Sequence, residues 1–163
     1  MLRPITFAII LSFSFVALSF ENKTLSFIDP TGWVTQKTEV PSVNALYFSV
    51  PANRKSASVL ISTTTPRPNK MNPNDFVRQS FASEAKKYKD FKLYGLKELP
   101  EVKSPHALKQ FTYTKNNIPY KGMVLLAQSE KDNYLFHFTA EESVYPTYES
   151  EVIAIFKSVK LKK

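Results

Sequence analysis

Few residues in this chain could carry out acid–base chemistry, because it has no cysteine and only two histidines, His106 and His137. A nucleophilic site needs a base beside a serine or cysteine, so it would depend on one of these imidazoles. His137 lies in the apolar stretch YLFHFTA, where a neutral structural histidine is the common finding. His106 follows Pro105 in an expected loop and is interpreted as a surface residue. No catalytic residue, and hence no enzyme, is predicted.

Carboxylates offer the other route to chemistry. The nearest candidates for a metal site are Asp29 and the adjacent pair Glu141 and Glu142, but metal sites cluster more ligands at close spacing. Two carboxylates could hydrolyse a glycosidic bond only at a set separation, which sequence does not define. The three glycines are not clustered, so no phosphate-binding loop is expected. We therefore expect no metal and no cofactor, and rank a carboxylate-based hydrolase last.

Two basic segments could bind a partner instead. The segment KKYKDFKLYGLK (86–97) interleaves lysines with aromatic residues, as do sites for nucleic acid or anionic polymers. Lysines on an edge strand also block aggregation, and this interpretation is preferred. The segment TPRPNKMNPN (65–74) is a long loop, and such loops are often functional. Arg67 and Lys70 are its predicted partner contacts, with a simple connection into a helix as the alternative.

The first 19 residues have the order of a secretory signal peptide, with Arg3 near the start, an apolar run over 5–18 and small residues before a cut after Ser19. The apolar run is shorter than the ~20 residues of a spanning helix, although an uncleaved anchor stays an alternative. We expect a signal peptide over 1–19 and one exported domain over 20–163, in the periplasm or outside the cell. The net charge of +8 favours acidic partners or simple solubility, and export argues against nucleic acid.

Hydrophobic patterning indicates the elements that would position any site. Strands are expected over 25–28, 45–50, 57–64, 91–98, 107–114, 119–128 and 132–140, with hairpin turns at PANRKS, KNNI and SEKDN. A helix is expected over 75–89, capped by Asn72 or Asn74, and a second one from Tyr145. Strands apolar on both faces imply a sheet covered on both sides. The predicted fold class is α+β, an antiparallel β-sheet flanked by helices on both faces (an α/β/α sandwich), with a basic KLKK tail.

The stretch FIDPTGWVTQK (27–37) holds the only tryptophan, Trp33, just after Pro30 and Gly32. Proline and glycine at this spacing indicate a tight turn. A buried tryptophan contributes mainly through its large apolar area. We therefore interpret Trp33 as a packing residue at the domain edge that fixes how the first strand enters the sheet, rather than as a binding anchor.

Together these motifs resemble the PsbP-like and Mog-type proteins, which share an F…P.GW opening, here Phe27, Pro30, Gly32 and Trp33, and a C-terminal helix ending near Ser158. The resemblance covers most of residues 25–160. It implies a non-catalytic binding or assembly module, since members include an extrinsic subunit of the photosynthetic oxygen-evolving complex, a Ran-binding protein and exported bacterial proteins of unassigned role. A basic N-terminal arm is missing here, and export is incompatible with a nuclear role, so neither specific role is expected.

The predicted function is therefore that of an exported, non-catalytic module that recognises an envelope protein or component through surface loops. It is expected to be a monomer with no stable membrane insertion after signal cleavage. The alternative is a small-molecule carrier with an aromatic-lined pocket between sheet and helix, which 13 Phe and eight Tyr make feasible.

Overall fold

A computed structural model describes residues 19–49, 58–67 and 70–162, so the signal segment before Ser19 and the PANRKS turn lie outside the described residues. The elements are β1 (Ser19–Glu21), β2 (Leu25–Ile28), β3 (Val34–Thr35), β4 (Val43–Ser49), β5 (Ser58–Pro66), α1 (Pro73–Ser80), α2 (Ala82–Lys87), β6 (Lys89–Gly95), β7 (His106–Lys115), β8 (Ile118–Gln128), β9 (Asp132–Glu141), α3 (Tyr145–Ser158) and β10 (Lys160–Leu161). Every predicted strand is present, the one over 25–28 with the same bounds and the others with shifted ends, whereas β1, β3 and β10 were not predicted.

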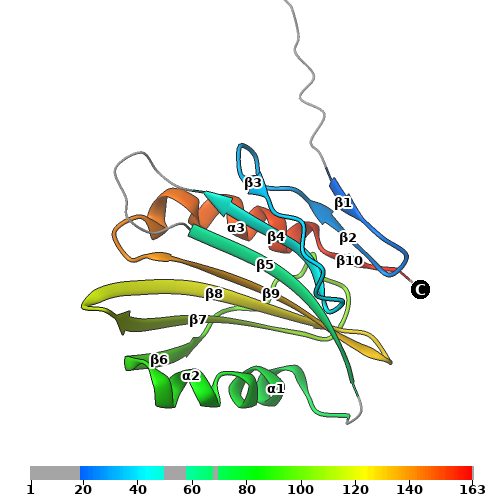
Figure 1. Ribbon diagram of the computed structural model, residues 1–163. Helices are drawn as coiled ribbons and strands as arrows, with labels where there is room; N and C mark the ends of the chain where they lie inside the picture. The colour runs from blue at the N-terminus through cyan, green and yellow to red at the C-terminus, as the bar shows by residue number, and fades with distance from the viewer. Residues whose placement is uncertain (1–18, 50–57, 68–69, 163) are drawn as a thin grey trace, which may run out of the picture.

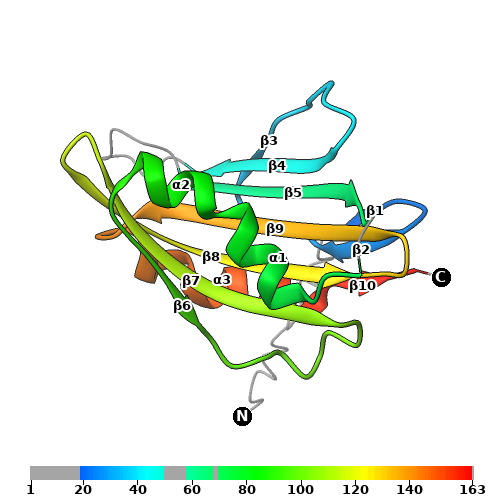
Figure 2. The same cartoon turned by 90° about the horizontal axis from the view of Figure 1, so that it is seen from below.

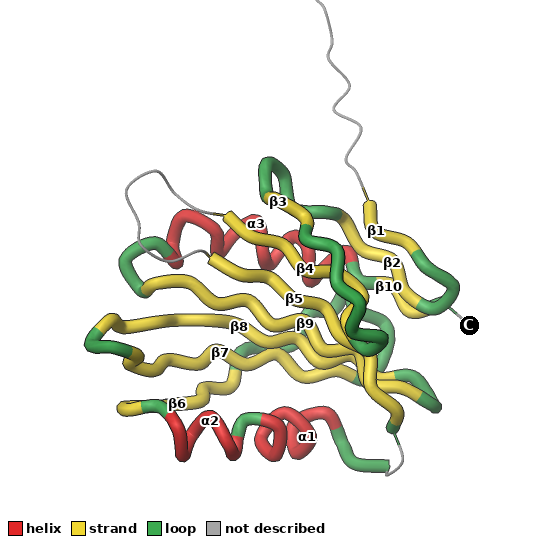
Figure 3. The backbone as a smooth tube through the Cα atoms, viewed as in Figure 1, coloured by secondary structure: helices red, strands yellow, loops and turns green. Residues whose placement is uncertain are grey.

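Seven strands form one antiparallel sheet in the order β3-β4-β5-β9-β8-β7-β6 (Figures 1 and 3). Most neighbours are also neighbours in sequence, but β5 pairs with the distant β9, which places Leu60 opposite Phe138. The predicted KNNI turn joins β7 to β8. Asn116 and Asn117 have φ angles of 52° and 61° there, the left-handed values that a two-residue type I′ turn requires. The α+β class and the antiparallel sheet are confirmed.

Alternate side chains of β8 enter two different cores. Met123, Leu125 and Ala127 belong to a core cluster that includes Phe156 of α3. Val124 and Leu126 belong to a second cluster that includes Val77 of α1 and Phe81. Figure 2 shows α1 and α2 lying across one face of the sheet, with α3 behind it. Burial on both faces therefore explains why this strand reads as continuously apolar.

The side of the sheet that carries α3 is more complex than predicted. A second, three-stranded antiparallel sheet, β1-β2-β10, shares this side with the helix. Its central strand contributes Leu25 and Phe27 to the core cluster of α3, and the Phe27 ring meets the Phe136 ring edge-on at 5.1 Å. The expected arrangement of one sheet covered by helices alone is therefore incomplete, because part of the cover is itself a sheet.

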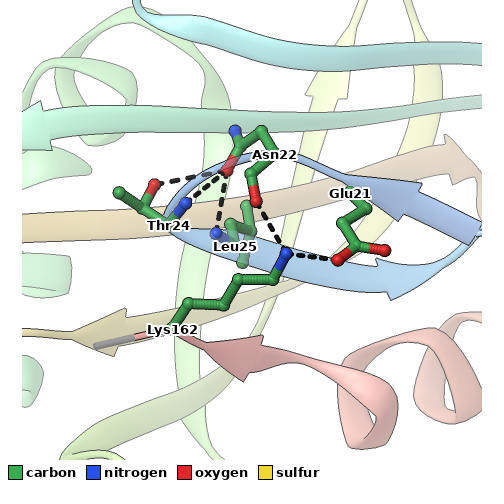
Figure 4. A network of polar contacts seen from close by, with 5 residues as sticks. All are labelled: Glu21, Asn22, Thr24, Leu25 and Lys162. Atoms are coloured by element: carbon green, nitrogen blue, oxygen red, sulfur yellow. Dashed lines mark hydrogen bonds and ion pairs between the residues drawn. The ribbon is translucent and has the colours of Figure 1, made fainter.

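The predicted KLKK tail is part of this small sheet. Lys160 and Leu161 pair with Ser26 and Leu25 of β2. Lys162 then forms an ion pair with Glu21 and donates from Nζ to the Asn22 carbonyl at 2.8 Å (Figure 4). The C-terminal strand thus closes against the first hairpin, a pairing between the two ends of the domain that no local sequence pattern reveals.

The helix predicted over 75–89 is broken in two at Phe81. Asn72 caps its start, since its side chain accepts the Asp75 N–H at 3.0 Å. Phe81 leaves the helical path at φ −92° and ψ 3°. Its ring lies 5.1 Å from that of Phe111, so packing into the core accompanies the break. Within the described residues, no helix has both the length and the apolar character needed to cross a membrane.

Candidate functional site

The two predicted partner contacts occupy different environments. The half-buried guanidinium of Arg67 donates to the Ser129 carbonyl at 2.9 Å and to the Met71 carbonyl at 3.2 Å. The backbone N–H of Arg67 also donates to the Lys131 carbonyl at 2.7 Å. Lys70 is exposed. Arg67 is therefore engaged inside the domain, where it ties the 65–74 loop to the β8–β9 turn, and Lys70 is the member of the pair that reaches solvent.

The β8–β9 turn borders an open cavity of about 1100 Å³. Four segments that are distant in sequence form its walls: the β1–β2 turn, the connection between β6 and β7, the β8–β9 turn with the adjoining strand ends, and the C-terminal strand with its flanks. The lining residues are Thr24, Glu101, Lys103, Ser104, Gln128, Ser129, Glu130, Lys131, Asp132, Tyr134, Val159, Lys160, Leu161 and Lys162. We call this the end cavity, because it lies where β8 ends and β9 begins.

His106 fixes one wall of the end cavity. Its Nε2 accepts the Leu99 N–H at 3.1 Å, so its Nδ1 carries the proton and donates to the Ser104 carbonyl at 2.9 Å. Leu99 and Val102 of the same connection are buried. The half-buried His106 therefore holds the backbone of the β6–β7 connection in place through both ring nitrogens. Its interpretation as a surface residue is wrong.

The apolar part of the end cavity comes from Tyr134, Val159 and Leu161, while charged and uncharged polar side chains line the rest. Two of the charges are committed to other groups of the protein. Glu101 forms an ion pair with Lys157 at 3.1 Å, and Lys162 forms its ion pair with Glu21. A cavity with apolar and charged walls suits recognition of an amphipathic group, since burial of apolar surface supplies affinity and polar contacts fix orientation.

His137 is placed for packing rather than for catalysis. Its ring centroid lies 4.9 Å from that of Phe111 and 5.6 Å from that of Phe81, beneath the helices. Burial lowers the pKa of His137 to about 4, and the attraction of Glu84 opposes this only in part. The imidazole is therefore neutral near pH 7, in agreement with its interpretation as a structural histidine.

The carboxylates considered from the sequence do not form a site together. Asp29 accepts the Tyr47 hydroxyl at 2.5 Å. Burial, reinforced by this carboxylate, raises the pKa of Tyr47 far above its ordinary value. Glu141 ends β9, and Glu142 lies just beyond it. Among the described residues, no three His, Asp or Glu side chains come close enough together to hold a metal ion.

Trp33 lies against α3. Its half-buried ring packs near Tyr148 and Phe138, with centroid separations of 5.0 and 6.1 Å. Its Nε1–H donates to a Glu151 carboxylate oxygen at 3.1 Å, and the other oxygen of Glu151 accepts the Thr31 N–H. Gly32 has φ 76°, and Pro30 is buried. These contacts explain how the segment between β2 and β3 is held against the helix.

Sequence reasoning missed the end cavity because its walls meet only through long-range pairing. One signal was available: the connection KELPEVKSP (97–105) combines two prolines with charges of both signs. Connecting segments of this kind run over the surface and often carry binding residues. The C-terminal wall carried no comparable signal, since KLKK reads as a solvated tail.

The comparisons with known proteins bear on the fold. No family model matches the sequence, and no curated protein is similar to it at a significant level. Among solved structures, the chain is similar to LpqN of Mycobacterium tuberculosis, a protein involved in cell envelope biogenesis, with a TM-score of 0.64, 13% identity, and coverage of 85% of this chain and 83% of LpqN.

The chain is also similar to the cyanobacterial PsbP protein CyanoP from Synechocystis sp. PCC 6803, with a TM-score of 0.57, 12% identity, and coverage of 85% of this chain and 86% of CyanoP. Both structures match nearly the whole described domain at identities too low to carry function. The PsbP-like fold suggested by the sequence is therefore confirmed, and it is the fold alone that these similarities show.

Proposed function

We propose that this chain is an exported, non-catalytic module that recognises an envelope protein or component at the end cavity. The observation that carries this proposal is the cavity itself, about 1100 Å³ in volume and bordered by apolar, polar and charged side chains from four separate segments. The structural similarity to LpqN, a protein involved in cell envelope biogenesis, supports an envelope setting. Recognition through loops held on a rigid sheet is a common arrangement for binding proteins.

The same proposal covers the organisation of the chain. Residues 1–19 act as a cleavable signal peptide, and residues 20–163 form one PsbP-like domain that works as a monomer without stable membrane insertion. The sheet with helices on both sides is taken as the α/β/α sandwich of Mog-type proteins, extended by the small sheet. Export to the periplasm or the extracellular space then brings the domain into contact with its envelope partner.

The predicted loop over 65–74 takes part in two ways. Arg67 holds the β8–β9 turn in place through the Ser129 carbonyl, so it shapes the cavity without touching the partner. Lys70 is exposed and available as a direct contact. Reversing the charges of Arg67 and Lys70 together would therefore confound a positioning role with a contact role. The two residues need separate substitutions.

The carrier alternative finds less support. The space between the sheet and α3 is filled by fully buried aromatic side chains, including Phe136, Phe138 and Phe156. The Phe136 and Phe156 rings lie 6.1 Å apart, and the Phe138 and Tyr145 rings lie 5.6 Å apart. A ligand placed there would have to displace packed side chains, whereas the end cavity is already open.

Site-specific photocrosslinking in living cells tests the proposal. A photoreactive amino acid replaces Lys131 at the end cavity, and in a matched variant it replaces Lys115 in the turn at the other end of β8. Both lysines are exposed, so both variants should fold equally well. We expect a discrete adduct from position 131 and none from position 115. Equal adducts from both positions, or none from position 131, would overturn the end cavity as the recognition site.

A further inference from the structure

Strand β10 has an open edge, and its register shows which backbone groups point outward. The Lys162 N–H donates to the Thr24 carbonyl at 2.9 Å, and Leu161 lies opposite Leu25. In an antiparallel pair, hydrogen-bonded and non-hydrogen-bonded positions alternate. Leu161 is therefore at a non-hydrogen-bonded position, so its N–H and C=O point away from β2.

The opposite flank of β2 supports this register. Asn22 N–H donates to the Leu25 carbonyl at 2.9 Å, so the backbone of Leu25 points toward β1 and away from Leu161. Ile28 N–H, which faces the side of β10, donates instead to Ser158 Oγ at 2.9 Å. Among residues 19–49, 58–67 and 70–162, no backbone group pairs with the outward N–H of Leu161.

The end cavity runs along this stretch of chain. Val159, Lys160, Leu161 and Lys162 all line it, and the other lining residues come from the β1–β2 turn, the β6–β7 connection, and the β8–β9 turn with the adjoining strand ends. An edge strand presents unpaired N–H and C=O groups that another chain can pair with. Here the unpaired groups of Leu161 coincide with a cavity large enough to admit a segment of extended chain.

The charges around the end cavity favour a polypeptide over a polyanion. After Glu101 and Lys162 are paired with Lys157 and Glu21, the side chains that remain include Lys131 and Lys160 but also Glu130 and Asp132. A third lysine, Lys103, also lines the cavity. A polyanion would meet the two carboxylates as well as these three lysines. A peptide backbone, in contrast, offers both a donor and an acceptor, which is what Leu161 requires.

We propose that an extended peptide segment of the partner adds to β10 as a fourth strand of the small sheet. Its backbone pairs with the N–H and C=O of Leu161, and an apolar side chain of the segment packs beside the half-buried side chain of Leu161. Strand addition of this kind takes affinity from backbone hydrogen bonds and specificity from alternate side chains. This inference rests on the proposed function, since it names the chemistry of the partner at the same cavity.

Amide hydrogen exchange on the mature domain provides the first test, with Lys162 as the internal control. In the free protein the Leu161 amide should exchange faster than the Lys162 amide, which is bonded to Thr24. The probe is a synthetic peptide selected from a phage library of random sequences panned against the mature domain. Bound peptide should slow exchange at Leu161 at least about tenfold, because that N–H becomes hydrogen-bonded. Unchanged exchange at Leu161 with saturating peptide would overturn the proposal, as would a library that gives no binder.

A pair of variants provides the second test. Leu161→Pro removes the outward N–H, a change that edge strands tolerate. Leu161→Ala removes the same side-chain packing but keeps the N–H, so it serves as the matched control. We expect Leu161→Pro to bind the peptide about tenfold more weakly than Leu161→Ala, since one lost hydrogen bond and a blocked edge separate them.

The result of the variant test can be separated from that of the crosslinking test. Equal affinity in the two Leu161 variants, both folded by circular dichroism, would overturn strand addition. If Lys131 still crosslinked to a partner in cells, the end cavity would stand as the recognition site and only the mode of binding would be wrong. Loss of the adduct at position 131 would instead remove the proposed function and this inference together.

Discussion

Acidification should destabilise the fold through His137, and the size of the effect follows from its surroundings. The pKa of this imidazole is about 4 in the folded protein, against 6.5 for an ordinary histidine, because burial penalises its charged form. Below pH 6.5 the unfolded chain therefore binds a proton that the folded chain does not. The free energy of unfolding contributed by neutral His137 is fully present above this pH, falls as the pH drops, and stops falling near pH 4. A shift of about 2.5 pKa units corresponds to about 3 kcal/mol.

Urea unfolding of the wild type and of His137→Phe, at a series of pH values from about 7.5 to about 4, measures this effect. Phenylalanine suits the site because the ring lies among Phe81 and Phe111. Paired carboxylates lose stability in both proteins, so the difference between the two curves isolates His137. We expect the wild type to lose about 3 kcal/mol relative to the variant across this range. Parallel curves would refute the reasoning and show that His137 is protonated without penalty in the fold.

Two further predictions concern packing. Gly122→Ala should lower the free energy of unfolding, measured with urea, by about 3 kcal/mol. A Cβ at position 122 would lie 2.1 Å from Phe111 Cζ and 2.3 Å from the Phe138 carbonyl oxygen. The control, Gly95→Ala, should leave the stability nearly unchanged, because its Cβ meets only Lys109 Nζ at 3.6 Å. Trp33→Ala should lower the free energy of unfolding, followed by circular dichroism, by about 3 kcal/mol. The crosslink at position 131 should be kept. A variant of unchanged stability that loses the crosslink would instead make Trp33 a binding anchor.

The proposed site depends on residues that the sequence assigns to other roles. Arg67 was predicted as a partner contact, yet its guanidinium is bonded to backbone carbonyls of Met71 and Ser129. An arginine has five N–H donors in a fixed planar fork, which suits it to bridging two carbonyls in this way. The assignment of Lys70 as a partner contact stays a prediction, whereas Arg67 is proposed to hold the β8–β9 turn in position.

Local chemistry made the hairpins and the start of the first helix predictable. Two asparagines can adopt the left-handed conformation of a two-residue turn, and Asn116 and Asn117 do so. A short side-chain oxygen can accept a free N–H of a first helical turn, and Asn72 does so. The break at Phe81 was not predictable, because the helical periodicity of apolar residues continues through it. The bend lets the Phe81 ring pack against the Phe111 ring, and only the structure shows this contact.

The sequence by itself determined every strand of the large sheet except β3, its burial on both faces and the PsbP-like fold, because these depend on residue type and short-range spacing. Only the tertiary structure decided that Lys160 and Leu161 form a strand beside β2 and that four distant segments line the end cavity. Both features depend on contacts between residues far apart in the chain. Short strands such as Lys160–Leu161 carry too few residues to have a pattern of their own, so their pairing is set by the partner strand that the fold brings to them.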